Sequence, residues 1–267
     1  MVLNWQFLNR AISHISEEYT LMNLFLPCYN ELRMKKPEVV ILHGWAISAA
    51  NKEKWHAFRS ELQSQGIKST FLPLPGLSTE LATPWSLQNY VEWLEHTLAD
   101  SKEVILLGHS FGGQLAVRYT AQHQSQIAKL ILVASAGVRD YSLKARSKRA
   151  FFYLLAKLGF MLKSLPVVKK LFYKLVGEHD YESAPPVMKE TMRHILADEI
   201  REDLYQVNCP VQLVWGTLDT ITPFKTTQLF LSRLSNARLC SISSARHSPQ
   251  FTHSDKVAAC VAEFLLP

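Results

Sequence analysis

Six short and nearly uninterrupted apolar runs constrain the fold of this 267-residue chain more than any other feature. Such runs are typical of parallel β-strands that are buried on both faces of a sheet. Helical patterns lie between most of them, and this order predicts an open, mostly parallel α/β sheet with helices on both faces. The predicted strands are residues 38–42, 70–74, 104–107, 130–134, 211–215 and 238–242, and the predicted helices are residues 55–65, 86–100, 114–124, 223–234 and 256–266.

The alternation of strands and helices is interrupted between residues 139 and 207. This stretch has a helical pattern, contains no strand-like run and is punctuated by glycines and prolines, including the pair Pro185-Pro186. We therefore expect a helical insertion between two strands of the sheet. The chain then divides into an α/β core of residues 1–138 and 208–267 and an insertion of residues 139–207.

Charge and cysteine placement exclude several classes of function. The formal net charge of +6 is modest and no nucleic-acid-reading motif occurs, so nucleic-acid binding is not expected. The cysteines form no C-x-x-C pair and have no histidine at ligand spacing, which argues against a zinc site and gives no sign of a disulfide framework. We expect reduced, mostly buried thiols at Cys28, Cys209, Cys240 and Cys260.

The sequence contains no secretory or membrane-spanning signal. Its first ten residues lack a basic stretch followed by an apolar one. No run of about 18 apolar residues occurs, because Lys157 and Lys163 interrupt the longest candidate. We therefore expect a soluble cytoplasmic protein. The first 35 residues are difficult to assign; their pattern is compatible with an amphipathic helix near Trp5 to Ile15 and shows no clear β-hairpin.

A strand-to-helix junction carries the first candidate for catalysis. The run Gly108-His109-Ser110-Phe111-Gly112-Gly113 follows one predicted strand and precedes a predicted helix. A Gly-x-Ser-x-Gly run in this context forces the serine into a tight turn that lifts its hydroxyl above the sheet. The glycines remove side chains that would clash within the turn. The pattern predicts Ser110 as a nucleophile, and a glycine-rich turn with a solvent-exposed serine is the alternative.

A serine nucleophile requires a base, and a histidine base requires a carboxylate that orients it. Asp219 follows the fifth predicted strand and precedes Thr222-Pro223, a pair that predicts a helix start. His247 follows the last predicted strand. Because open α/β sheets place their sites at the carboxyl ends of the strands, we expect Ser110, Asp219 and His247 to form a catalytic triad. The structural alternatives are a turn-capping aspartate and a surface histidine.

Acyl transfer also requires donors for the oxyanion that develops in the transition state. The backbone N–H of Phe111, at the start of the helix after Ser110, is the first candidate. The run His43-Gly44-Trp45 ends the first predicted strand, and Gly44 lets the backbone approach closely, so the N–H of Trp45 is the second candidate. His43 precedes the serine in the chain and fits a structural role better than that of a base.

Taken together, these motifs resemble the α/β-hydrolase superfamily, and within it the lid-bearing serine esterase and carbon–carbon hydrolase group. The resemblance runs from about residue 39 to the C-terminus, and the insertion matches only in position. It implies the α/β-hydrolase fold, a helical lid domain over the serine, and no metal or organic cofactor. The runs that carry it are residues 43–45, 74–76, 108–113, 215–219 and 247–249.

The expected lid contains a stretch, residues 144–175, that is basic and apolar and has no acidic residue. In the proteins that the chain resembles, a lid at this position covers the serine, so we expect its aromatic face to line an acyl pocket. Two alternatives remain open. Basic helices of this kind also rest weakly on anionic lipid, or their apolar stripe simply packs on the core while the lysines are solvated.

The favoured hypothesis is a serine hydrolase that cleaves a carboxylic ester, or a related acyl compound, through an acyl-enzyme on Ser110. His247 would act first as base and then as acid, and Asp219 would orient it. A carbon–carbon hydrolase of a dienoate-type diketone, or an acyltransferase, would use the same triad. A non-catalytic ligand-binding protein on this fold is a further alternative. The expected partner is a small-molecule acyl substrate, and the sequence leaves the bond, the acyl chain and the oligomeric state open.

Overall fold

The computed structural model describes residues 38–46, 51–139 and 184–266. The expected helix from Trp5 to Ile15 lies outside the described residues. Residues 140–183 of the expected insertion, with the basic stretch 144–175, also lie outside them. Within the described ranges, no helix is both long enough and apolar enough to cross a membrane.

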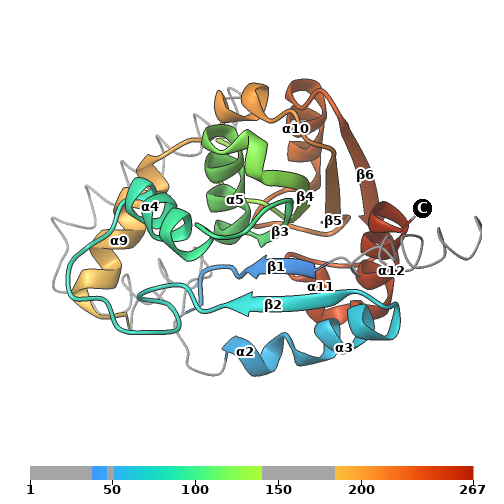
Figure 1. The fold of residues 1–267 in the computed structure, drawn as a ribbon, viewed down its shortest axis with the longest axis horizontal. Helices are drawn as coiled ribbons and strands as arrows, with labels where there is room; N and C mark the ends of the chain where they lie inside the picture. Colours follow the sequence, from blue (N-terminus) through green and yellow to red (C-terminus); the bar gives the residue numbers. More distant parts are fainter. Residues whose placement is uncertain (1–37, 47–50, 140–183, 267) are drawn as a thin grey trace, which may run out of the picture. The chain divides into compact units, whose positions relative to one another are not determined.

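Parallel strands form one sheet in the order β2-β1-β3-β4-β5-β6, in the part of the chain that the structure describes (Figure 1). The strand order reverses at β1, which lies between β2 and β3. Ligand sites of open α/β sheets lie beyond the carboxyl ends of the strands at such a point. The strands are β1 (Glu38–Leu42), β2 (Lys68–Leu72), β3 (Val104–His109), β4 (Ile127–Val133), β5 (Val211–Gly216) and β6 (Ala237–Ile242).

Helices cover both faces of this sheet (Figure 1). Successive strand residues point to opposite faces, and β4 shows the effect. Ile131 and Val133 are buried in a cluster with residues of α3 and α12, whereas Leu130 and Leu132 are buried with residues of α4, α5, α9 and α10. These helices are α3 (His56–Ser64), α4 (Leu87–Thr97), α5 (Phe111–Gln122), α9 (Pro186–Ala197), α10 (Thr227–Arg233) and α12 (Ser254–Leu265).

The predicted parallel sheet with helices on both faces is confirmed, and the differences lie at the ends of its elements. β4 begins at Ile127, three residues before the predicted run, and β2 begins at Lys68. The helix predicted to start at residue 114 begins at Phe111, directly after the candidate nucleophile. The helix predicted over residues 223–234 is divided into a 3₁₀ turn, η3 (Phe224–Thr226), and α10. The short helices α2 (Asn51–Lys54) and α11 (Pro249–Thr252) were not predicted.

The described end of the expected insertion, residues 184–207, packs against the core. It forms α9 and a 3₁₀ turn, η2 (Asp203–Gln206). Met188 of α9 is buried in the same cluster as residues of α4 and α5. The Nε of Arg118 on α5 donates to Asp203 Oδ2 over 2.7 Å. A shared apolar cluster and an ion pair to α5 therefore hold this segment on the core, and the boundaries of the lid remain a prediction.

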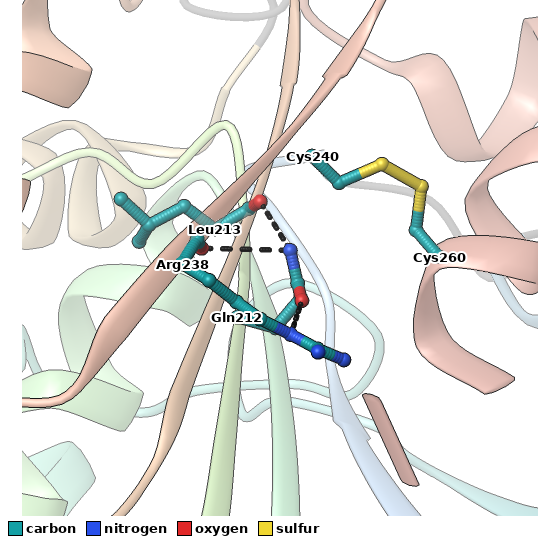
Figure 2. The surroundings of a disulfide bond; sticks show 5 residues. All are labelled: Gln212, Leu213, Arg238, Cys240 and Cys260. Atoms are coloured by element: carbon teal, nitrogen blue, oxygen red, sulfur yellow. Dashed lines mark hydrogen bonds between the residues drawn. A yellow bond between two sulfur atoms is a disulfide. The ribbon is translucent and has the colours of Figure 1, made fainter. Parts of the chain in front are cut away.

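Cys240 of β6 and Cys260 of α12 form a disulfide bond (Figure 2). The expectation of four reduced thiols is therefore wrong for this pair. The two cysteines are 20 residues apart in the sequence, and only the packing of α12 beside β6 brings them together. Cys209 is free and partly buried, and burial raises the pKa of its thiol to about 11. Cys28 lies outside the described residues.

Side-chain hydrogen bonds join β6 to β5 (Figure 2). The Nε of Arg238 on β6 donates to Gln212 Oε1 on β5 over 2.6 Å, and Gln212 Nε2 donates to the Leu213 carbonyl over 3.0 Å. On the helix side, the Arg238 guanidinium carbon lies 4.9 Å from the ring centroid of Phe264. Arg238 therefore links β6 both to its neighbouring strand β5 and to the helix α12.

Replacing both Cys240 and Cys260 by serine should lower the free energy of unfolding by about 3 kcal/mol, because the bond closes a loop of this length in the unfolded chain. Denaturant unfolding without reductant measures the difference. Adding dithiothreitol should destabilise the parent but not the double variant. Cys209→Ser is the matched control, because it removes a thiol that forms no bond. Equal stability of parent and double variant in oxidising buffer would contradict the prediction.

Candidate active site

Ser110 stands in a sharp turn between β3 and α5. Its backbone has φ 52° and ψ −114°, a conformation that side-chain-bearing residues rarely adopt. Two glycines make the turn possible. A Cβ added to Gly108 would lie 2.4 Å from the Gly112 carbonyl oxygen, and one added to Gly112 would lie 2.1 Å from the Leu42 carbonyl oxygen of β1. The turn therefore packs directly on the backbone of the neighbouring strand, and its serine is held above the strand ends.

The structure brings the three predicted catalytic residues together. Ser110 Oγ lies 3.0 Å from His247 Nε2, and His247 Nδ1 lies 2.9 Å from Asp219 Oδ2. Asp219 follows β5, and His247 follows β6, so each side chain comes from the carboxyl end of a different parallel strand. Hydrogen-bond distances of this kind join a nucleophile, a base and an orienting carboxylate.

Asp219 is buried and ionised. Burial opposes its negative charge, but hydrogen bonds from His247, Thr222 and the Ile221 N–H outweigh that effect, so the pKa of Asp219 lies below its ordinary value of 3.8. The backbone N–H groups of Ile221 and Thr222 donate to Oδ1 over 2.8 and 3.0 Å. Oδ1 is thus held by the backbone of its own loop, which leaves Oδ2 to accept from His247.

Thr222 has a role that the sequence reasoning missed. It was expected to cap a helix, but no helix begins directly after it, and Pro223 precedes η3 without a side-chain cap. Instead its Oγ1 lies 2.7 Å from Asp219 Oδ2, 3.2 Å from His247 Nδ1 and 3.1 Å from the Ala134 carbonyl. The hydroxyl therefore lies beside the carboxylate–imidazole pair. A Thr-Pro dipeptide is such a common helix start that the sequence alone did not point to this contact.

His109, the residue before the nucleophile, was also missed. Its Nε2 lies 3.0 Å from the His247 carbonyl, to which it donates. Burial, and then the nearby His247, lower the pKa of His109 to about 3, so the ring is neutral at physiological pH. The ring also has edge contacts with Trp55 and Phe251. His109 thus fixes the backbone of the residue that carries the candidate base.

His43 occupies the structural position expected for it. Its Nε2 accepts from the Leu74 N–H over 3.2 Å and lies 3.0 Å from Ser78 Oγ, while its Nδ1 lies 2.8 Å from the Gly44 carbonyl. Burial lowers the pKa of His43 to about 4. The neutral ring therefore joins the end of β1 to the loop that follows β2.

The two predicted oxyanion donors lie on segments that meet beside Ser110. Phe111 is the first residue of α5, and its ring has an edge contact with Trp45, with the ring centroids 6.1 Å apart. Gly44 permits the approach, since a Cβ there would lie 2.7 Å from His109 Nδ1 and 3.2 Å from Ser110 Cβ. The loop after β1 is thus packed on the turn, and the donor roles of the two backbone N–H groups remain a prediction.

A cavity of about 140 Å³ opens beside the nucleophile. Its wall includes Ser110 and His247, together with Lys54 of α2, Trp55 directly before α3 and Phe251 of α11. Trp55 and Phe251 supply apolar surface, and Lys54 supplies a positive charge. Within the described residues, no group of three or more histidine, cysteine or acidic side chains is arranged to hold a metal ion.

Comparison with known proteins gives a family match and many distant relatives. Residues 39–260 match the model of the Alpha/beta hydrolase family. The pimeloyl-[acyl-carrier protein] methyl ester esterase of Aromatoleum aromaticum is 25% identical over 86% of this chain and 98% of its own. The enzyme of that name from Chromobacterium violaceum is 25% identical over 91% of this chain and 98% of its own.

Solved structures share the fold at lower sequence identity. A putative lipase from Acinetobacter baumannii AYE has a TM-score of 0.65 and 19% identity, covering 87% of this chain and 84% of its own. A meta-cleavage product hydrolase from Pseudomonas fluorescens IP01 has a TM-score of 0.60 and 16% identity, covering 85% of this chain and 90% of its own. At these identities the structures support the fold alone.

The buried His109 should make stability depend on pH. Between its ordinary pKa of 6.5 and its folded pKa of about 3, the unfolded chain binds a proton that the native protein excludes. The free energy of unfolding should therefore fall by about 1.4 kcal/mol per pH unit below 6.5 from this residue. His109→Asn, which keeps a donor, should reduce the slope measured by denaturant unfolding between pH 6 and 4.5. An unchanged slope would contradict the prediction, and His96→Asn on the exposed surface of α4 is the control.

Proposed function

The chain belongs to the alpha/beta hydrolase family, and we propose that it is a serine esterase that cleaves carboxylic esters through an acyl-enzyme on Ser110. One observation carries the proposal: Ser110 Oγ, His247 and Asp219 form a continuous hydrogen-bonded chain, with links of 3.0 and 2.9 Å. The named activities of the relatives from Aromatoleum aromaticum and Chromobacterium violaceum support an ester as the substrate.

In the first step, His247 Nε2 takes the proton of Ser110 Oγ as that oxygen attacks the ester carbonyl. The new C–O bond gives a tetrahedral intermediate, and the N–H groups of Phe111 and Trp45 donate to its oxyanion. When the intermediate collapses, the bond to the alcohol oxygen breaks, and His247 returns its proton to that oxygen. The alcohol leaves, and the acyl group stays on Ser110.

In the second step, a water molecule takes the place of the alcohol. His247 removes a proton from the water as the oxygen attacks the acyl carbonyl, and the same proton is returned to Ser110 Oγ when the acid leaves. Throughout both steps, Asp219 holds the proton of His247 on Nδ1 and stabilises the imidazolium. The buried, ionised state of the Asp219 carboxylate suits it to this role.

The alternatives, carbon–carbon hydrolysis of a dienoate-type diketone and acyl transfer to an acceptor alcohol, would use the same residues. The names of the curated relatives favour esters, and methyl esters of carboxylic acids are therefore the first substrates to test. Turnover of such esters, without loss of absorbance from a dienoate diketone, distinguishes the esterase from the carbon–carbon hydrolase. A non-catalytic binding protein would hydrolyse neither.

Ser110→Ala should abolish labelling by a fluorophosphonate probe and lower kcat/KM for a methyl ester at least about a thousandfold, because the attacking oxygen is lost. Ser232→Ala, at an exposed serine of α10, is the matched control and should label like the parent. Mass spectrometry of the labelled peptide identifies the modified residue. Labelling of Ser110→Ala to the same extent as the parent would sink the proposal.

Thr222→Val should lower kcat/KM about tenfold, because a hydroxyl 2.7 Å from the Asp219 carboxylate is replaced by a methyl group of similar shape. Thr222→Ser restores the hydroxyl and should recover most of the activity. Circular dichroism and thermal unfolding of both variants separate this effect from a loss of folding. Equal rates for the valine and serine variants would show that the hydroxyl does not act on the triad.

A further inference from the structure

The cavity beside Ser110 has a volume of about 140 Å³. Ser110 and His247 line one part of it, and Lys54 lines another. An acyl group that is attached to Ser110 and enters this cavity therefore lies in a space that Lys54 also borders.

The charges around this cavity are all of one sign. Lys54 is the cationic side chain among its described lining residues, and no acidic side chain is among them. The buried Asp219 carboxylate lies behind His247 rather than on the cavity wall. His43 and His109, which also line the cavity, are neutral, because burial lowers the pKa of each to about 4 and about 3. The cavity therefore favours a negative group.

The ammonium group of Lys54 is available to a ligand. Lys54 is the last residue of α2, and the buried Trp55 that follows it fixes this end of the helix in the core. Its side chain is exposed, and no acidic partner is found for it among the residues that the structure describes. Trp55 and Phe251 give the same cavity an apolar wall that suits a short carbon chain.

We propose that Lys54 binds a carboxylate carried by the acyl group, so that the preferred substrates are half-esters of short dicarboxylic acids. This inference rests on the proposed esterase function and names its substrate class. The carbon chain would lie along Trp55 and Phe251, with the ester carbonyl at Ser110 and the free carboxylate at Lys54. A neutral ester of the same shape would lack the charge pair.

Two methyl esters of equal shape test the proposal. Methyl hydrogen succinate carries a carboxylate, and methyl succinamate carries an amide in its place. The parent should show a kcat/KM about tenfold higher for the half-ester, and 0.5 M NaCl should reduce the preference by screening. Lys54→Met should remove the preference by slowing half-ester hydrolysis alone, and Lys54→Glu should reverse it. Lys52→Met, on the same short helix, is the matched control and should preserve it. An unchanged preference in Lys54→Met would overturn the proposal.

Binding to a catalytically inactive protein separates this inference from the proposed function. Titration calorimetry of Ser110→Ala with the two esters should show tighter binding of the half-ester, and the added change Lys54→Met should abolish the difference. Equal binding of the two esters to Ser110→Ala would overturn the carboxylate site, whatever the parent hydrolyses. Lys54-dependent binding without any hydrolysis by the parent would support the site and contradict the esterase.

Discussion

The close packing of the turn around Ser110 on β1 determines where everything else in the site must lie. No side chain separates Gly112 from the Leu42 carbonyl, and a single methyl group there would clash at 2.1 Å. This contact sets the height of α5 above the sheet and holds Ser110 in its unusual backbone conformation. The loops after β5 and β6 then need only modest length to bring Asp219 and His247 to the same point.

The sequence predicts the inner strands of the sheet well because β3, β4 and β5 are largely buried, which leaves apolar runs with few polar gaps. The prediction is weakest where other forces decide. β2 lies at the sheet edge and carries polar residues such as Lys68. The apolar run therefore begins later in the sequence than the strand does. α5 also starts earlier than predicted. Its first turn contains two glycines, which usually weaken a helix, so the sequence pattern placed the helix start after them. In the structure, close packing requires both glycines within the helix. The pairing of Cys240 with Cys260 depends on tertiary structure alone.

The candidate triad could be predicted because strand order and chain order together limit which aspartate and histidine can reach Ser110. The contacts that support the triad could not be predicted, because they depend on the directions of side chains.

Three histidines lie close together near Ser110, and their surroundings give them different roles. His43 and His109 are buried and neutral, and their ring nitrogens bind backbone groups. His247 faces the ionised Asp219 and the serine hydroxyl, and it is therefore the histidine suited to accept and return a proton.

The disulfide has a consequence for the integrity of the site. His247 lies in the segment between Cys240 and Cys260, so the segment that carries it is a covalent ring. A protease that cuts the chain once within this ring does not release the C-terminal fragment, because the sulfur atoms still join the two pieces. β6 and α12 stay linked on either side of such a nick. The histidine therefore stays tethered to the sheet in a nicked molecule.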